Sequence, residues 1–304
     1  MNGLPGGEKK IRLAGIFQYM NLKNIKAKTN PFHSYNVMLC LLFLVLMAWS
    51  WHSTEISVKT LMEGWRNMGI YVGGDPAIEG SGFFPPEFQE MRLKKYLLSM
   101  LETIQMAFLA LILSVVIAFP LSFFASRNTL EIIIPGRNWF STGLRKTFYM
   151  ATRLIANLSR SINELVWALL FVSAVGLGPM PGILALGVHT SGVLIKLFSE
   201  GIENIQPEPI TALTSTGAGS FKVIRYAVIP QIAPFFVSMI LYRFESDVRS
   251  ATILGFTGAG GIGMYLFDKL RSYDNKDVTT ILIIIIIAVA LVDRLSAVIR
   301  KRYT

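Results

Sequence analysis

The sequence is poor in the residues that most metal and catalytic sites require. It has 1 cysteine and 3 histidines among 304 residues. The single Cys40 excludes an intrachain disulfide and a cysteine-based zinc site, and the widely separated histidines form no His-Glu-x-x-His motif. No Gly-Lys dipeptide occurs, which excludes a Walker-type phosphate loop. We therefore expect no enzyme activity in this chain, no metal site, and no ATP or other cofactor bound to it.

Charged residues are also scarce. They make up 16% of the chain, against about a quarter in ordinary soluble domains. Hydrophobic residues make up 52%, and the mean hydropathy is +0.50. The apolar residues fall in long runs rather than alternating with polar ones. This composition predicts an all-α integral membrane protein.

The apolar runs predict about six transmembrane helices. A hydrocarbon core about 30 Å thick needs roughly 20 apolar residues in helical form. The expected spans are Tyr35–Trp51, Thr103–Ala125, Ile162–Val175, Gly182–Phe198, Tyr226–Phe244 and Val278–Ile299. The expected organisation is a polar tail (1–36), a first transmembrane helix (37–52), a long loop (53–97) and a core with five transmembrane helices (98–304).

Basic residues predict the orientation. Lysine and arginine gather before the first span, after the second, between the fourth and fifth, and at the end of the chain. Short loops rich in these residues stay on the cytoplasmic side, so both termini are expected there. The loop 53–97 is balanced by acidic residues, although Arg92, Lys94 and Lys95 are a local exception. The net charge of +10 thus indicates topology rather than a nucleic-acid partner.

Gly258, Gly260 and Gly263 match the Gly-x-Gly-x-x-Gly dinucleotide fingerprint. That fingerprint is meaningful only between a strand and a helix, and here it lies between two expected spans. It predicts a compact turn with close backbone packing. The alternative is a set of exposed amides that face an anion or a partner.

The connection 205–222 has the pattern of a short surface helix. Pro209 suits a helix start, and Gly217 suits a helix end. Such a unit is either a docking site for another protein or an ordinary amphipathic loop. Physical reasoning on the residues leaves both open.

A resemblance favours the docking site. The connection resembles the coupling loop of ABC importer permeases, Glu-Ala-Ala-x3-Gly-x9-Ile-x-Leu-Pro. The positions in register are Ala212, Gly217 and Pro230, with Ile229 in place of leucine. The departures are Thr211 for the glutamate, Leu213 for the second alanine and Ala227 for the isoleucine. Glu208, about one turn earlier, is a candidate to supply the missing carboxylate.

Three longer stretches carry a more specific resemblance. Residues 160–179, 185–198 and 248–263 resemble the phosphonate-transport permease family, and the likeness extends over about 95–300. It implies a homodimeric permease in the bacterial inner membrane, with two cytoplasmic ATPase subunits that bind ATP and Mg, and a periplasmic solute-binding protein. The expected solute is a phosphonate-type oxyanion, with phosphite and phosphate as further candidates.

A self-sufficient secondary transporter or channel for small anions is the alternative function. It would predict inverted repeats and carboxylates deep within the spans. No clear repeat is present, and the clearest apolar runs carry no charge. The permease is therefore the favoured interpretation.

Ionisable residues near the fifth span are candidates for the solute pathway, because charges at membrane depth usually face protein or water. Arg243 and Arg249 either form i,i+4 ion pairs with Asp247 and Glu245, or attract an oxyanion through their forked donors. The two interpretations predict different partners for the same arginines.

Polar residues in the third and fourth spans have similar alternatives. Asn163 and Glu164 either cap the third span or line an inner gate. His189 and Thr190 either hydrogen-bond between helices or contact solute oxygens. These four side chains, together with Arg243 and Arg249, are the six candidate pathway residues.

Overall fold

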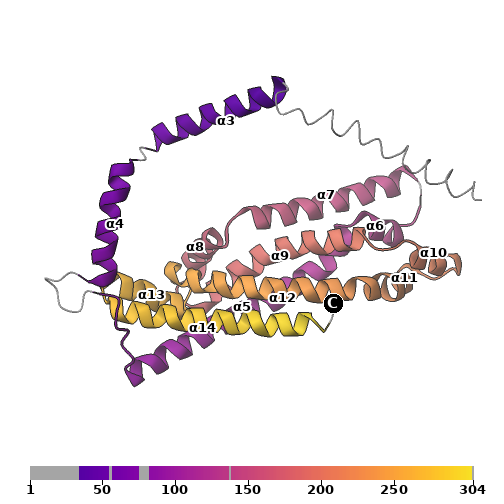
Figure 1. The fold of residues 1–304 in the computed structure, drawn as a ribbon. Coiled ribbons are helices and arrows are strands. Elements are labelled where there is room, and N and C mark those ends of the chain that lie inside the picture. Colours follow the sequence, from indigo (N-terminus) through magenta and orange to yellow (C-terminus); the bar gives the residue numbers. More distant parts are fainter. Residues whose placement is uncertain (1–33, 55–56, 75–81, 137, 303–304) are drawn as a thin grey trace, which may run out of the picture. The chain divides into compact units, whose positions relative to one another are not determined.

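The computed structural model describes residues 34–54, 57–74, 82–136 and 138–302, and the regular elements among them are all helical (Figure 1). The chain divides into two compact units, residues 1–68 and 69–304. The first unit holds α3 (Ser34–Ser53) and most of α4 (Val58–Gly73). α3 is apolar along its length and long enough to cross a membrane, so it is a candidate for the first expected span.

The second unit, here called the core, contains the remaining elements. These are α5 (Glu90–Phe124), α6 (Arg127–Ile133), α7 (Trp139–Ser161), α8 (Glu164–Val175), α9 (Pro179–Glu203), α10 (Glu208–Ser215), α11 (Ser220–Val223), η1 (Ile224–Val228), α12 (Ile229–Leu254), η2 (Gly255–Thr257), α13 (Gly261–Arg271) and α14 (Asn275–Arg300).

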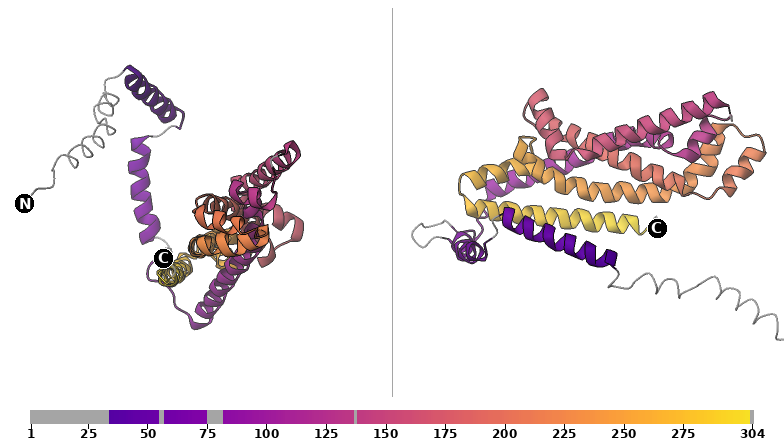
Figure 2. Two further views of the ribbon diagram at one scale, coloured as in Figure 1. Left: turned by 90° about the vertical axis from the view of Figure 1, so that its right-hand side faces the viewer. Right: turned by 90° about the horizontal axis from the view of Figure 1, so that it is seen from above.

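Helix α9 lies at the centre of the core and packs against α5, α7, α8 and α12. Figure 1 shows α9 between α7 and α12, with α14 beyond α12, and the end-on view in Figure 2 shows the same bundle along its axis. The short helices α6, α10 and α11 gather at one end, called here the α10 end. Helix α13 lies at the opposite, α13 end.

Small residues bring α9 close to its neighbours. A Cβ on Gly192 would lie 2.7 Å from the Ala156 carbonyl oxygen of α7, so only glycine permits this approach. The Ser114 hydroxyl of α5 donates to the Gly187 carbonyl at 3.0 Å. Close backbone contact and interhelical hydrogen bonds are the usual means of holding membrane helices together. They fix α9 as the element around which the core is built.

The third expected span is corrected by the structure. Ile162–Val175 was expected to cross the membrane alone, but α8 has only 12 residues. The 23-residue α7 precedes it, and the two helices meet at an angle of 88°. Only together do they satisfy the length and hydropathy of a span. With this bent pair counted once, the described residues contain six candidate spans, as predicted.

The region expected as a loop, 53–97, is also more ordered than predicted. It contains α4 and the first turns of α5, which begins at Glu90 rather than near residue 98. The basic exception noted in the sequence lies in those turns. There Arg92 bonds Asp277 of α14 at 3.0 Å, and Lys95 lies over the Tyr265 ring at 4.6 Å.

Asp277 is the centre of an ion cluster at the α13 end. The same carboxylate oxygen accepts from Tyr96 at 2.8 Å and pairs with Lys269 at 2.6 Å. Lys269 also contacts Asp274 at 2.7 Å. Burial opposes the positive charge of Lys269, but these two carboxylates outweigh it and raise the pKa of the ammonium group. The cluster therefore ties α5, α13 and α14 together.

The glycine motif forms the compact turn that the sequence predicts. Gly258 and Gly260 have φ of +87° and +79°, which glycine adopts without steric cost. A Cβ on Gly263 would lie 2.0 Å from the Thr252 carbonyl oxygen. The end of α12 and the start of α13 thus touch backbone to backbone, with no room for a bound dinucleotide between them.

Candidate functional site

The α10 helix is the most prominent feature of the α10 end. It has no buried residue, and Glu208, Thr211 and Ala212 are all exposed. Gly217 follows in the left-handed conformation, with φ of +75°, and ends the helix. The predicted order of surface helix, glycine break and membrane helix is confirmed. An exposed helix held at both ends has the form of a docking element.

Side chains outside the sequence motif hold this element in place. Gln231 of α12 accepts from the Gln206 amide at 3.1 Å, just before α10. After α10, Ser220 donates to the Ile132 carbonyl of α6 at 2.5 Å. The coupling segment is therefore tied to α12 on one side and to α6 on the other. The sequence contains no separate signal for either contact, because both partners are remote in the chain.

Pro230 lies where the coupling segment enters α12. Proline has no amide hydrogen, so it cannot continue the normal helical ladder. The chain adopts the wider π-helix η1 immediately before it, and the Ile229 amide donates to the Ile224 carbonyl. The Gln231 side chain donates to the Ala227 carbonyl at 2.7 Å. Short π segments of this kind are frequent at functional sites.

The second candidate region is the break between α7 and α8. Asn163 caps α8, and its side-chain oxygen accepts from the Leu165 amide at 2.9 Å. His189 of α9 contacts both sides of the break. Its Nδ1 lies 2.9 Å from the Ile162 carbonyl, and its Nε2 lies 3.5 Å from the Glu164 carboxylate. Since a carbonyl can only accept, Nδ1 carries a proton and the imidazole is fixed in orientation.

One face of α12 completes this region. The Ser250 hydroxyl donates to Glu164 at 2.8 Å. About two turns earlier, Arg243 donates to Asp247 and to Thr190 of α9, each at 2.9 Å. Thr190 in turn donates to the same Asp247 oxygen at 2.8 Å. We call these residues the break cluster: Asn163, Glu164, His189, Thr190, Arg243, Asp247 and Ser250.

Arg249 lies outside the break cluster. It pairs with Asp293 of α14 at 2.9 Å and with Glu245 at 3.9 Å. Both predicted i,i+4 ion pairs of α12 are therefore present. Helix α12 continues past these residues to Leu254, beyond the expected end of the fifth span at Phe244.

The break cluster thus unites five of the six predicted pathway residues and adds two. Asp247 was considered only as an ion-pair partner, and Ser250 was missed. The signal for Ser250 was its spacing, since positions 243, 247 and 250 share one helical face. Among the described residues, no group of three His, Cys, Asp or Glu side chains is placed to hold a metal ion.

Comparison with known proteins agrees with this geometry. The profile described as "Binding-protein-dependent transport system inner membrane component" matches residues 139–304, more than half of the chain. The chain belongs to this family. The match begins at Trp139, so it includes α7 and every later element, but not α3, α4, α5 or α6.

Curated relatives of this inner membrane component extend the match. The phosphite transport system permease protein PtxC of Stutzerimonas stutzeri is 32% identical over 263 residues, covering 86% of this chain and 87% of the relative. The putative cryptic phosphonate transport system permease protein PhnE2 of Escherichia coli K12 is 46% identical over 121 residues, or 40% of this chain and 99% of that protein. They confirm the resemblance to phosphonate-transport permeases.

A solved structure confirms the fold. The membrane chain in an inward-facing structure of the MetNI methionine ABC transporter superposes with a TM-score of 0.59, over 71% of this chain and 100% of that chain. The two sequences are 22% identical, so this similarity concerns architecture alone. The predicted class, an all-α membrane protein with the fold of an ABC importer permease, is confirmed.

Proposed function

We propose that the chain is the permease subunit of an ABC importer that carries phosphonate-type oxyanions across the inner membrane, powered by ATP hydrolysis on a partner subunit. The observation that carries the proposal is the exposed helix α10, anchored to α6 and α12 within a chain of this family. The named activities of the relatives support the solute class, since they include a phosphite and a phosphonate system.

In this proposal, two copies of the chain form a homodimer, and each α10 docks on one cytoplasmic ATPase subunit. Glu208 lies in the first turn of α10 and is exposed, so it can meet a basic residue of the ATPase in place of the family glutamate. The α10 end and both termini then face the cytoplasm. A periplasmic solute-binding protein delivers the oxyanion to the opposite side.

The contacts provide a route from the docking helix to the break cluster. Gln231 joins the coupling segment to α12, and Ser250 joins α12 to Glu164 beside the break. A displacement of α10 would therefore reach the α7–α8 bend through one continuous helix. The break cluster and Arg249 line the proposed oxyanion pathway, where contacts must be transient for the solute to leave.

Reconstitution tests the docking role. The permease, its ATPase and its binding protein are placed in liposomes, and uptake of labelled methylphosphonate is measured with and without ATP. Ala212→Arg on α10 should abolish ATP-dependent uptake and lower retention of the ATPase during purification. Ser272→Arg, an exposed position at the α13 end, is the matched control and should retain the ATPase as the wild type does. Normal uptake by the Ala212→Arg variant would refute docking through α10.

The same liposomes separate the two function classes. A self-sufficient secondary transporter or channel would accumulate or leak the oxyanion with no ATPase present. The proposed permease requires the ATPase and hydrolysable nucleotide. Competition of unlabelled phosphite, phosphate and methylphosphonate for uptake then ranks the solutes.

A further inference from the structure

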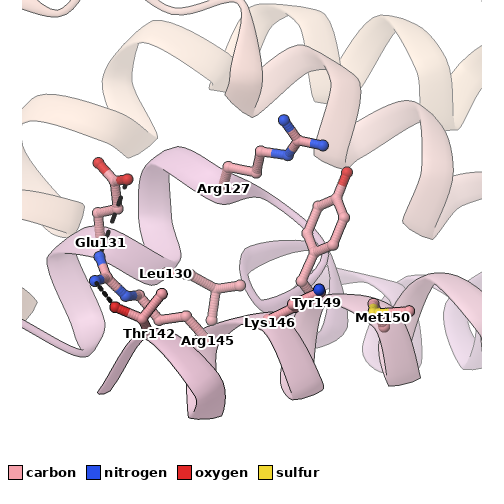
Figure 3. Close-up of a pocket in the computed structure, with 8 residues that line it drawn as sticks. All are labelled: Arg127, Leu130, Glu131, Thr142, Arg145, Lys146, Tyr149 and Met150. Atoms are coloured by element: carbon pink, nitrogen blue, oxygen red, sulfur yellow. Dashed lines mark hydrogen bonds and ion pairs between the residues drawn. The ribbon is translucent and has the colours of Figure 1, made fainter. Parts of the chain in front are cut away.

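A hollow of about 500 Å³ lies between α6 and α7 at the α10 end (Figure 3). Three cationic side chains line it, Arg127, Arg145 and Lys146, against one carboxylate, Glu131. It is separate from the break cluster, since no residue of that cluster lines it. A hollow with surplus positive charge is chemically suited to an anion.

Arg145 is held in position for such a ligand. Its guanidinium donates to the Gly136 carbonyl at 2.8 Å and to Thr142 at 3.5 Å. Its contact with Glu131 is long, 4.0 Å, and the Glu131 side chain is 73% exposed. A long, solvated pair contributes little, so Glu131 does not neutralise Arg145 effectively. The arginine is fixed by its backbone contact and retains donors for a further acceptor.

The other two cations have no carboxylate partner within the part of the chain that the structure describes. Arg127 lies over the Tyr149 ring, with its guanidinium carbon 5.1 Å from the ring centre. Figure 3 shows Arg127 beside Tyr149 on one side of the hollow and Glu131 with Arg145 on the other, with Leu130 between them. Arginine forks and a lysine ammonium are the usual donors to phosphate oxygens.

The remaining wall of the hollow is apolar. It consists of Leu130, which is buried, and Met150, which is exposed. The same helix α7 exposes Trp139, Phe140 and Leu154. A free inorganic anion gains nothing from such a wall, whereas an acyl chain does. Exposed tryptophan is also typical of the level of lipid headgroups.

We propose that this hollow binds the phosphate group of an anionic phospholipid, with the start of an acyl chain against Leu130 and Met150. Basic pockets between membrane helices are suited to acidic headgroups. The surplus of cations favours an anionic lipid over a zwitterionic one. Because Ile132 of α6 also accepts the hydrogen bond from Ser220, a bound lipid would hold α6 against the coupling segment.

The test uses the full-length permease in nanodiscs of phosphatidylcholine with or without phosphatidylglycerol. Lipid that remains bound after gentle detergent extraction is identified by native mass spectrometry. The wild-type chain should retain phosphatidylglycerol over phosphatidylcholine. The variant Arg127→Gln/Lys146→Gln should lose this preference by on the order of tenfold. The control Arg271→Gln/Lys276→Gln removes the same two charge types at the α13 end and should keep it.

A second variant tests the apolar wall. Met150→Asn leaves all three cations in place and changes an exposed side chain, so the fold should be retained. It should weaken retention of long-chain phosphatidylglycerol but not of a short-chain analogue. Equal loss of preference in the α13-end control would indicate diffuse surface attraction and overturn the proposal. Displacement of the lipid by millimolar inorganic phosphate would identify a free anion as the ligand and also overturn it.

Discussion

Two charged clusters of the core differ in how their carboxylates are balanced. At the α13 end, Asp277 meets two cations, Arg92 and Lys269, and the Tyr96 hydroxyl. In the break cluster, Glu164 accepts from Ser250 and lies 3.5 Å from His189, and among the described residues no lysine or arginine lies within ion-pair distance of it. The first arrangement joins three helices through compensated charges. The second spans a bend in the backbone, and its Glu164 is held by a hydroxyl and an imidazole rather than by a permanent cation.

The comparison distinguishes a rigid region, the α13 end, from a bend in the backbone between α7 and α8. At the α13 end, the backbone of α13 at Gly263 also packs directly against the end of α12, which leaves these two helices little room to move. Around Glu164, the chain is interrupted, and the bend is held by a cap and by His189. We therefore expect changes at the α13 end to reduce stability, and changes at the break to reduce transport at nearly normal stability.

The largest effect is expected for Gly263→Ala. The new Cβ would lie 2.0 Å from the Thr252 carbonyl oxygen and 3.0 Å from the Gly255 Cα, and backbone cannot move aside as a side chain can. We expect a loss of at least about 3 kcal/mol of stability, measured as a lower melting temperature in detergent. Gly143→Ala is the control, since a Cβ there meets no atom within 4 Å. An unchanged melting temperature for Gly263→Ala would contradict the locked α12–α13 contact.

The next effect is expected for Asp277→Asn. The substitution keeps the size of a fully buried side chain but leaves Arg92 and Lys269 without their shared anion. Removal of one partner from a fully buried ion pair costs about 3 kcal/mol, and the cost here should be smaller because both cations are partly exposed and Lys269 keeps Asp274. The melting temperature should fall, while uptake per folded molecule should stay near that of the wild type. Asp268→Asn, an exposed neighbour, should change neither. If Asp277→Asn lost uptake but kept its melting temperature, the structural role assigned to the α13-end cluster would be wrong.

Much of the fold was predictable because long apolar runs have few alternatives in a membrane protein. α5 is the clearest example, since its run Thr103–Ala125 carries no charge and is long enough for a full span. The α7–α8 pair was not predictable in the same way. α7 carries Arg145, Arg153 and Arg160 on an amphipathic helix, so its sequence has the composition of a basic surface segment. The 88° bend then divides one span into two helices, and neither helix alone is both long enough and apolar enough to cross a membrane.

The sequence was sufficient to predict most of the residues of the candidate site, but not which of them contact one another across helices. Helical spacing separates Arg243 from Arg249, which lies on another face of α12 and pairs with α14. By contrast, His189 bonds a backbone carbonyl 27 positions away, and Gln231 bonds an amide 25 positions away. Contacts to remote backbone atoms have no sequence pattern. They follow from helix packing, which the single sequence does not specify.

A smaller effect, on transport rather than stability, is expected for Glu164→Gln. The amide still accepts from Ser250 but removes the negative charge facing His189. ATP-dependent uptake should fall about tenfold, equivalent to about 1.4 kcal/mol, with little change in melting temperature. Ser250→Ala removes the hydrogen bond and keeps the charge, so it should reduce uptake less. A drop in melting temperature as large as that of Asp277→Asn would show that the two clusters serve the same structural purpose.

The smallest effect is expected for Asn163→Ala, which removes the cap of α8. The Leu165 amide loses its acceptor, and such a loss costs about 1 kcal/mol. Asn163→Ser restores an acceptor at the same position and should recover most of the melting temperature. Because the cap is one of the contacts that hold the bend, uptake should fall in the alanine variant and recover with serine. If alanine and serine lower uptake equally, Asn163 acts through its amide on the solute rather than through the helix end.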